Sequence, residues 1–240
     1  MGRKAYITEI FNSIEGEGLK VGTLSLFIRF AGCNLRCPPC DTQYAWEDEP
    51  EMCTIYLRKG EKKIKNPIDI STLIDIIFDY KGVERLVLTG GEPLLNAGYI
   101  EELAEQLQYD RDICVETNST IPQGLARVIT SISEVSCDIK LKSVWGLEQD
   151  TQRLKRFLKI AKKRLVWVKC VVKPDTPPKE IEGVSQVVAS VSPIIPLILH
   201  PMDNSGDFNL DTIATMIRGG LKHLKEVRFL PRIHRTLGLR

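Results

Sequence analysis

The sequence predicts an α/β fold: a partial, open TIM-like βα barrel with a small β-hairpin insertion. Short apolar runs rich in strand-forming residues alternate with longer helical patterns, which is typical of a parallel sheet covered by helices. A complete barrel needs eight strand–helix units, and the alternation supplies too few of them. With 240 residues and 43% hydrophobic content, the chain is long enough for one domain with a substantial core.

The expected elements follow one another along the chain. Residues 25–30 and 86–88, for example, are dense in Leu, Val, Ile and Phe, which favours strands. Strands are expected near residues 25–30, 85–89, 112–116, 135–139, 165–172, 195–199 and 226–230. Helices are expected near residues 70–80, 97–108, 122–131, 150–163 and 209–219. In such a fold, ligands bind at the carboxyl ends of the strands.

Residues 43–69 interrupt this alternation. Two runs, 53–58 and 61–65, flank a Lys59-Gly60 turn and indicate a β-hairpin. Its lysines are typical of an exposed edge strand, where charge prevents pairing with another chain. A basic contact patch is the alternative interpretation. We expect residues 1–240 to form a single domain that carries this insertion.

Composition and charge narrow the possible functions. The chain has 33 basic and 31 acidic residues and a net charge of +2, so no strong field favours nucleic acid or a membrane as partner. No apolar run reaches membrane-spanning length, and the first residues lack the apolar core of a signal peptide. Seven cysteines without an export signal predict a cytoplasmic protein rather than a disulfide scaffold.

The loop after the strand at 25–30 concentrates the chemistry. Cys33, Cys37 and Cys40 are separated by three and then two residues, so their thiolates can converge on one face of a tight turn. Thiolates are soft ligands suited to zinc or to an iron–sulfur cluster. A structural zinc site needs a fourth ligand, which Asp41 could supply, but no second Cys-x2-Cys occurs. A four-iron cluster held by three cysteines leaves one iron open to a small chelating ligand, and we favour this interpretation.

A second motif ends the strand at 85–89. Thr89-Gly90-Gly91-Glu92-Pro93 contains two glycines that let the backbone approach a ligand closely. Glu92 carries a charge that attracts an ammonium group. Alone, the motif is a weak signal, and a plain strand-to-helix turn is its default interpretation. Combined with the cysteine loop, it indicates a ligand site.

Both motifs resemble those of the radical S-adenosylmethionine (SAM) enzymes. The resemblance implies a partial barrel of the radical SAM type, in which the open iron chelates the amino and carboxylate groups of SAM and the glycine turn binds the SAM amino group. Residues 9–18 and 27–33 are further similar to the 7-carboxy-7-deazaguanine synthases. The similarity continues through Cys40-Asp41-Thr42, 199–203 and 227–234, and it is weak in 43–69 and 141–165.

For this family, the resemblance implies a radical rearrangement of 6-carboxy-5,6,7,8-tetrahydropterin on the pathway to queuosine and archaeosine. The reduced 4Fe–4S cluster cleaves SAM, and the 5′-deoxyadenosyl radical takes hydrogen from carbon 6 of the pterin. Ring contraction with loss of ammonia then gives 7-carboxy-7-deazaguanine. The implied cofactors are the cluster, SAM and Mg²⁺. The implied partners are an external electron donor of the flavodoxin or ferredoxin type and a second copy of the chain in a homodimer.

The resemblance also assigns site residues position by position. The metal ligands are Cys33, Cys37 and Cys40 for the cluster and Thr42 for Mg²⁺. The substrate contacts are Ile14, Glu15, Gly16, Arg29 and Thr89. The cofactor contacts are Pro39, Asp41, Gly91, Glu92, Asp138, Lys140, His200 and Asp203, with 116–118 as further candidates. For three of these residues a purely structural role is the alternative interpretation. Thr42 could be a turn residue, Arg29 could form a surface ion pair, and Lys140 could form a salt bridge at the barrel rim.

Three positions depart from the usual residues of the family. Glu15 stands where Gln is common, and an extra carboxylate near an anionic substrate is unfavourable unless it accepts hydrogen bonds from pterin N–H groups. Pro39 stands where an aromatic ring often packs on adenine, so stacking is lost unless Tyr44 or Trp46 replaces it. His200 replaces a usual Gln and is more typical of a structural histidine.

Two other functions remain open at this stage. An activating enzyme of a glycyl-radical protein would use the same cluster and SAM, and 138–140 is similar to that class. Residues 15–18 with Arg29 argue against it, because an enzyme acting on a protein has no evident need for them. A non-catalytic zinc module is the other possibility. Iron, sulfide and zinc contents after anaerobic purification distinguish it from both radical enzymes.

Overall fold

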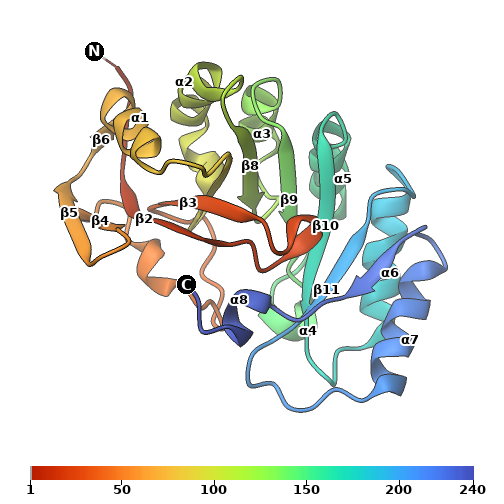
Figure 1. Ribbon diagram of the computed structural model, residues 1–240. Coiled ribbons are helices and arrows are strands. Elements are labelled where there is room, and N and C mark those ends of the chain that lie inside the picture. Colours follow the sequence, from red (N-terminus) through yellow and green to blue (C-terminus); the bar gives the residue numbers. More distant parts are fainter. Residues whose placement is uncertain (1) are drawn as a thin grey trace.

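Ten strands form one curved sheet in the computed structural model, which describes residues 2–240 (Figure 1). The strand order is β12-β11-β10-β9-β8-β7-β3-β2-β4-β5. The strands from β3 to β12 in this order are mutually parallel: β3 (Leu24–Phe30), β7 (Arg85–Gly90), β8 (Asp112–Thr117), β9 (Glu134–Asp138), β10 (Leu165–Val172), β11 (Leu197–Pro201) and β12 (Val227–Phe229). Within the described residues β12 pairs with β11 alone, so the barrel stays open.

The other strands extend the sheet beyond β3. β2 (Ile7–Ile14) lies antiparallel to β3 and parallel to β4 (Met52–Tyr56). β4 forms a hairpin with β5 (Glu61–Lys65). Two short strands, β1 (Lys4–Ala5) and β6 (Ile68–Asp69), pair in a separate small sheet. The N-terminal strand β2 thus lies next to the strand that leads into the cysteine loop.

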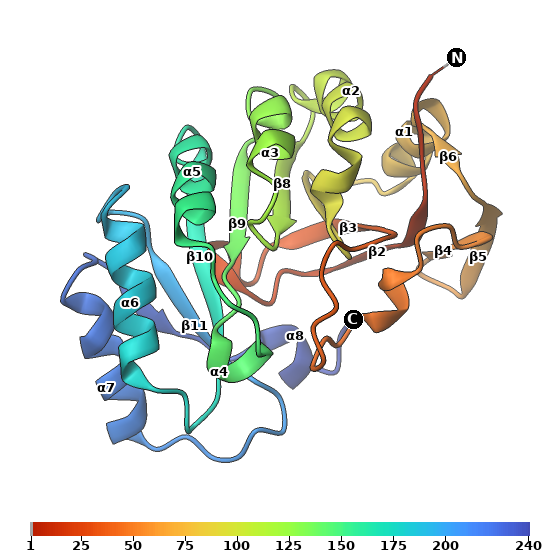
Figure 2. The ribbon, with the colours of Figure 1, turned by 180° about the vertical axis from the view of Figure 1, so that it is seen from behind.

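Helices cover the outer face of the parallel strands (Figures 1 and 2). They are α1 (Ile70–Asp79), α2 (Ala97–Leu107), α3 (Pro122–Val128), α5 (Thr151–Ala161), α6 (Pro178–Ala189) and α7 (Leu210–Leu221). Short helices lie in the connections: α4 (Lys142–Trp145), α8 (Ile233–Thr236), η1 (Gly18–Lys20), η2 (Gln43–Trp46) and η3 (Pro93–Asn96). Among residues 2–240, no helix has both the length and the apolar character needed to cross a bilayer.

Alternate residues of each strand face opposite sides of the sheet. Leu26 and Ile28 of β3 belong to the large core beneath the helices, whereas Phe27 belongs to an inner cluster. This inner cluster consists of Phe11, Phe27, Val87, Cys114, Trp167 and Ile198. Two positions further along the parallel strands, the inward residues are Arg29, Thr89, Glu116, Lys169 and His200. The period of the strands therefore gathers polar side chains above an apolar floor, at the carboxyl ends.

The predicted α/β fold and open parallel sheet are confirmed. Every expected strand and helix is present, with ends that lie within three residues of the expected ones. The expected hairpin is also present, formed by β4 and β5. The agreement is good because buried parallel strands and amphipathic helices carry strong hydrophobic periodicity.

Two longer elements, β2 and α6, are not expected from the sequence. In β2, Glu9 interrupts the apolar pattern, yet it is buried because it pairs with Arg29 at 2.7 Å. α6 is preceded by prolines and contains Gly183, which together indicate a loop. Pro178 instead occupies the first turn of the helix, where its missing N–H leaves no hydrogen bond unmade.

Asn66 attaches the insertion to the sheet. Its side-chain oxygen accepts a hydrogen bond from the Ile7 N–H at 3.1 Å. Its amide nitrogen donates to the carbonyl oxygens of Ile7 and Pro50, both at 2.9 Å. The residue is 7% exposed, so these backbone groups have little access to water. One side chain thus satisfies three backbone groups from two distant segments.

Replacing Asn66 with Ala should lower the free energy of unfolding by about 1–3 kcal/mol, because buried backbone groups of Ile7 and Pro50 lose their partners. Urea denaturation followed by circular dichroism measures this change. Lys62→Ala, on exposed β5, is the control and should change stability by less than about 0.5 kcal/mol. Equal stability of the two variants would show that Asn66 does not hold the insertion.

Candidate active site

A cavity of about 920 Å³ opens at the carboxyl ends of the parallel strands. Its walls come from the cysteine loop, the turn after β7, the ends of β8, β9 and β10, and the C-terminal segment. Most of the residues assigned from the sequence line it: Ile14, Glu15, Gly16, Arg29, Cys33, Cys37, Pro39, Cys40, Asp41, Thr42, Thr89, Gly91, Asp138, Lys140 and Asp203. Glu92 and His200 are not among its lining residues.

The three cysteines of the loop lie in the wall of this cavity. The Cys40 N–H donates to the carbonyl oxygen of Cys37 at 3.0 Å and closes a tight turn. Burial raises the pKa of the Cys33 and Cys37 thiols, and binding to a metal would reverse this effect by favouring the thiolates. No group of three His, Cys, Asp or Glu side chains in residues 2–240 is placed to hold a metal ion. The three thiols on one wall nevertheless have the soft donor chemistry that would hold an iron–sulfur cluster.

The turn after β7 packs tightly against the start of the cysteine loop. The Gly91 N–H donates to the Phe30 carbonyl at 3.1 Å, and the Glu92 N–H donates to the Gly32 carbonyl at 2.9 Å. A Cβ at Gly91 would lie 2.1 Å from the Gly32 oxygen. Gly90 has φ +144°, and a Cβ there would lie 2.3 Å from the Phe30 oxygen. Both glycines are therefore required by the packing of the two loops.

Glu92 is not among the residues that line the cavity, and its expected contact with SAM stays a prediction. It is fully buried, and its Oε1 accepts hydrogen bonds from the Leu94 N–H at 3.0 Å and the Thr117 hydroxyl at 2.8 Å. Its Oε2 accepts from the Asn118 N–H at 2.8 Å. Burial raises the pKa of Glu92 to about 7, although these donors oppose the shift. Both oxygens are thus occupied by the protein, and Glu92 joins the turn after β7 to the end of β8.

His200 is likewise not among the residues that line the cavity, and its expected contact with the cofactor stays a prediction. It is fully buried; its Nε2 accepts from the Gly18 N–H at 3.3 Å, so its Nδ1 donates to the Leu230 carbonyl at 2.7 Å. Burial lowers the pKa of His200, which favours this neutral form. The histidine ties β11 to the loop after β2 and to the end of β12.

The Glu15 carboxylate forms an ion pair with a buried arginine on the inner face of the sheet. Arg85, at the start of β7, contacts the Glu15 carboxylate at 2.8 Å and Glu134 at 2.9 Å. The Glu17 N–H donates to the other Glu15 oxygen at 3.2 Å. Burial and then the charge of Glu116 raise the pKa of Glu15 to about 7, against the effect of Arg85. The carboxylate at this unusual family position therefore has protein partners of its own.

Arg29 lies at the opposite side of the floor, with Thr89 as its register partner on β7. The Arg29 Nε donates to Glu9 at 2.7 Å. Glu9 also accepts from the Tyr44 hydroxyl at 2.9 Å and from Arg240 at 2.9 Å. The Arg29 guanidinium is thus fixed at one nitrogen while it lines the cavity. Tyr44 lines the same wall, as does Trp46, so both candidate replacements for the missing aromatic ring are present.

Two lysines face the cavity from neighbouring strands. Lys140 pairs with Asp138 at 2.9 Å and lies 3.8 Å from the centre of the Trp145 ring. Lys169 pairs with Glu17 at 2.7 Å and with Glu116 at 3.2 Å. The sequence analysis did not assign Lys169 or Glu17 to the site. A lysine inside the apolar run of β10 does indicate a buried charge, and a buried charge needs a partner of opposite sign.

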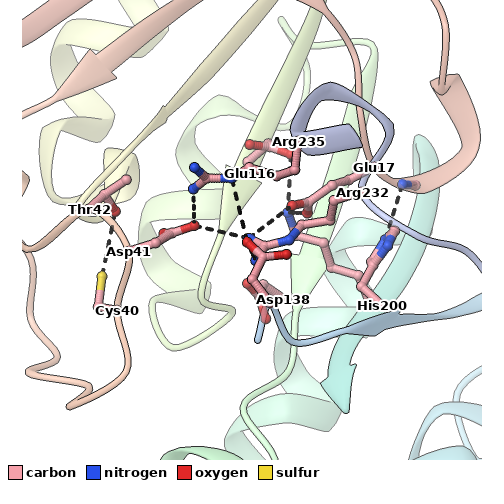
Figure 3. A network of polar contacts seen from close by, with 12 residues as sticks. Glu17, Cys40, Asp41, Thr42, Glu116, Asp138, His200, Arg232 and Arg235 are labelled. Carbon is pink, nitrogen blue, oxygen red and sulfur yellow. Dashed lines mark hydrogen bonds and ion pairs between the residues drawn. The ribbon is translucent and has the colours of Figure 1, made fainter. Parts of the chain in front are cut away.

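Asp41, beside the last cysteine, lies in a cluster of charges (Figure 3). Arg232 and Arg235 each contact its carboxylate at 2.9 Å. Burial disfavours the charged form, but the two arginines outweigh it and lower the pKa of Asp41. Both arginines come from the C-terminal segment and were not expected at the site. The Thr42 hydroxyl, one residue further, lies 3.5 Å from the Cys40 Sγ.

Comparisons with known proteins bear on this site. A family model described as the radical SAM superfamily matches residues 27–184. The chain is 32% identical to the 7-carboxy-7-deazaguanine synthase of Geobacter sulfurreducens, over 98% of this chain and 97% of that protein. It is 27% identical to the enzyme of the same name from Archaeoglobus fulgidus, over 99% and 100% of the two chains. The crystal structure of QueE from Escherichia coli has a similar fold, with a TM-score of 0.65, 21% identity and coverage of 95% and 93%.

Glu92→Gln should lower the free energy of unfolding by about 1–3 kcal/mol, because Gln has one acceptor oxygen and leaves the N–H of Leu94 or of Asn118 unpaired. Chemical denaturation at pH 8, above the raised pKa of about 7, measures the effect on the ionised carboxylate. Glu105→Gln, on the exposed side of α2, is the matched control. If both variants are equally stable, Glu92 does not hold the turn in place.

Proposed function

This chain belongs to the radical SAM superfamily and, within it, to the 7-carboxy-7-deazaguanine synthases, and we propose that it converts 6-carboxy-5,6,7,8-tetrahydropterin to 7-carboxy-7-deazaguanine with loss of ammonia. As a radical SAM enzyme it uses a 4Fe–4S cluster and SAM. The observation that carries the substrate proposal is the full-length similarity to enzymes of this name. Activation of a glycyl-radical protein and zinc binding are not favoured, because the relatives that match nearly the whole chain are named 7-carboxy-7-deazaguanine synthases.

When bound, the cluster and SAM supply the radical that takes hydrogen from carbon 6 of the pterin. Cys33, Cys37 and Cys40 would hold the cluster. We assign SAM to the wall formed by Pro39, Asp41, Gly91, Asp138, Lys140 and Asp203. Lys140 holds a positive charge that suits the SAM carboxylate, and its pairing with Asp138 keeps that charge in place.

We assign the pterin to the floor between β2, β3 and β7. Arg29 is oriented by Glu9 and offers its remaining N–H groups to the substrate carboxylate. Thr89 lies beside it, and the backbone of 14–16 lies across the floor. The pairing of Glu15 with Arg85 removes the repulsion that a free carboxylate would exert on an anionic substrate.

Further partners belong to the same proposal. Thr42 would hold Mg²⁺ together with the substrate carboxylate, since magnesium prefers oxygen ligands. The electron donor would be of the flavodoxin or ferredoxin type, and the enzyme would be a homodimer. All seven cysteines are unpaired in the part of the chain described, which suits the reducing cytoplasm. The product would enter queuosine or archaeosine synthesis.

The direct test incubates the anaerobically reconstituted protein with SAM, a reductant and 6-carboxytetrahydropterin. Mass spectrometry should detect 7-carboxy-7-deazaguanine and 5′-deoxyadenosine. Cys33→Ala should abolish SAM cleavage, because the cluster loses a ligand, whereas the buried and distant Cys53→Ala should retain it. SAM cleavage by the wild-type protein without the deazaguanine product would contradict the proposed substrate.

Arg29→Ala should raise KM for the pterin by about 10- to 100-fold, which corresponds to one lost charge-assisted contact. The Kd for SAM should change little, because Arg29 lies on the proposed substrate side. Steady-state kinetics and SAM titration measure the two effects, with Arg228→Ala on exposed β12 as control. An equal loss of affinity for both ligands would count against the assignment.

Thr42→Ala should blunt the dependence of the rate on Mg²⁺, because the protein loses its oxygen ligand for the ion. Thr42→Ser retains a hydroxyl and should restore most of that dependence. The rate as a function of Mg²⁺ concentration measures both variants. An unchanged dependence in Thr42→Ala would place the ion elsewhere.

A further inference from the structure

The C-terminal segment around α8 has no role in the proposed reaction, yet it contacts three walls of the cavity. The Ile233 N–H donates to the Gly16 carbonyl at 3.2 Å. His234 packs so closely on Gly16 that a Cβ there would lie 1.7 Å from its Nδ1. Arg232, the residue before Ile233, reaches Asp41 of the cysteine loop (Figure 3).

Arg232 joins carboxylates from three separate segments. Its Nη1 contacts Asp41 of the cysteine loop at 2.9 Å. Its Nη2 donates a hydrogen bond to the Asp203 carboxylate in the connection after β11. Glu17, in the loop after β2, lies 4.0 Å from Nη1. Each of these segments includes residues that we assign to a different ligand. The cysteine loop is assigned to the cluster and Mg²⁺, the connection after β11 to SAM, and the loop after β2 to the pterin.

The burial of Arg232 separates it from an ordinary surface ion pair. Its side chain is 12% exposed, whereas that of Arg235, which contacts the same two aspartates, is 47% exposed. Exposed pairs contribute little because water and salt screen them, but a partly buried guanidinium that bridges carboxylates is costly to remove. We therefore expect Arg232 to contribute more than Arg235 to the free energy that keeps Asp41 in place.

We propose that Arg232 is a positioning residue that clamps the cysteine loop to the SAM and substrate walls. Asp41 stands between Cys40 and Thr42, so a fixed Asp41 carboxylate restrains the backbone of a cluster ligand and of the proposed magnesium ligand. Arg232 itself takes no part in bond making. This inference deepens the proposed function and rests on it for the identity of the ligands, but the clamp itself is a property of the chain alone.

The first test needs neither cofactor nor substrate. In hydrogen–deuterium exchange of the apoprotein, Arg232→Gln should speed exchange of the amides around 40–46 by about 5- to 30-fold, while β9 and β10 stay unchanged. Arg228→Gln, which removes a charge from exposed β12, should leave the loop as in the wild type. Loop exchange at the wild-type rate in Arg232→Gln would overturn the clamp.

Two further variants keep this test decisive if Arg232→Gln folds poorly. Asp41→Asn weakens the same contact from the loop side, and Arg232→Lys keeps the charge without the planar fork and should give an intermediate rate. The double variant Asp41→Asn with Arg232→Gln should exchange no faster than the faster single variant. Additive effects of the two substitutions would overturn the proposed coupling between these residues.

The second test uses the reconstituted enzyme. Arg232→Gln should keep the wild-type iron content, because the cysteines are untouched, but the ratio of 5′-deoxyadenosine to deazaguanine should rise about fivefold or more as SAM cleavage loses its coupling to the substrate. An unchanged ratio despite faster loop exchange would overturn the positioning role. A wild-type enzyme that makes no deazaguanine would refute the proposed function, and the exchange experiment would still decide the clamp.

Discussion

Charge pairing on the inner face of the curved sheet is the constraint on which the cavity depends. A charge removed from water costs several kcal/mol unless a partner compensates it. Arg85, 4% exposed, is shared by Glu15 and Glu134. Lys169, 7% exposed as a residue, is shared by Glu17 and Glu116. Each cation bridges two carboxylates: Lys169 lies above the apolar inner cluster toward the carboxyl ends of the strands, and Arg85 lies on its other side, at the start of β7.

Other side-chain contacts bridge the open side of the barrel, where no strand pairing occurs among the described residues. β12 ends the sheet, and the side between it and β2 has no strand ladder among the described residues. Side chains from opposite ends of the chain cross this gap: Glu9 pairs with Arg240, and His200 accepts from the Gly18 N–H. The C-terminal segment is fixed in this way against the loop after β2, and the cavity gains its last wall.

The three departures from the usual family residues are each accommodated by neighbours. The Glu15 carboxylate has Arg85 as its partner, so it does not confront the cavity as a free charge. Pro39 lines the cavity together with Tyr44 and Trp46, which supply aromatic surface on the same loop. His200 acts as a hydrogen-bonded brace between β11, Gly18 and Leu230. The departures thus change internal contacts and leave the cysteine loop and Arg29 in the cavity wall.

The sequence by itself determined most of the strands and helices in their order, with β2 and α6 as exceptions, together with the hairpin insertion and the cysteine motif. These are local properties, because hydrophobic periodicity and residue spacing are contained in short stretches. Only the tertiary structure decided that Glu92 and His200 are buried among hydrogen-bond partners from other segments and that Glu17, Lys169 and Arg232 line the cavity. Their orientations depend on partners far away in the chain, such as Thr117 for Glu92 and Asp41 for Arg232, and no local pattern encodes which distant groups a buried charge will find.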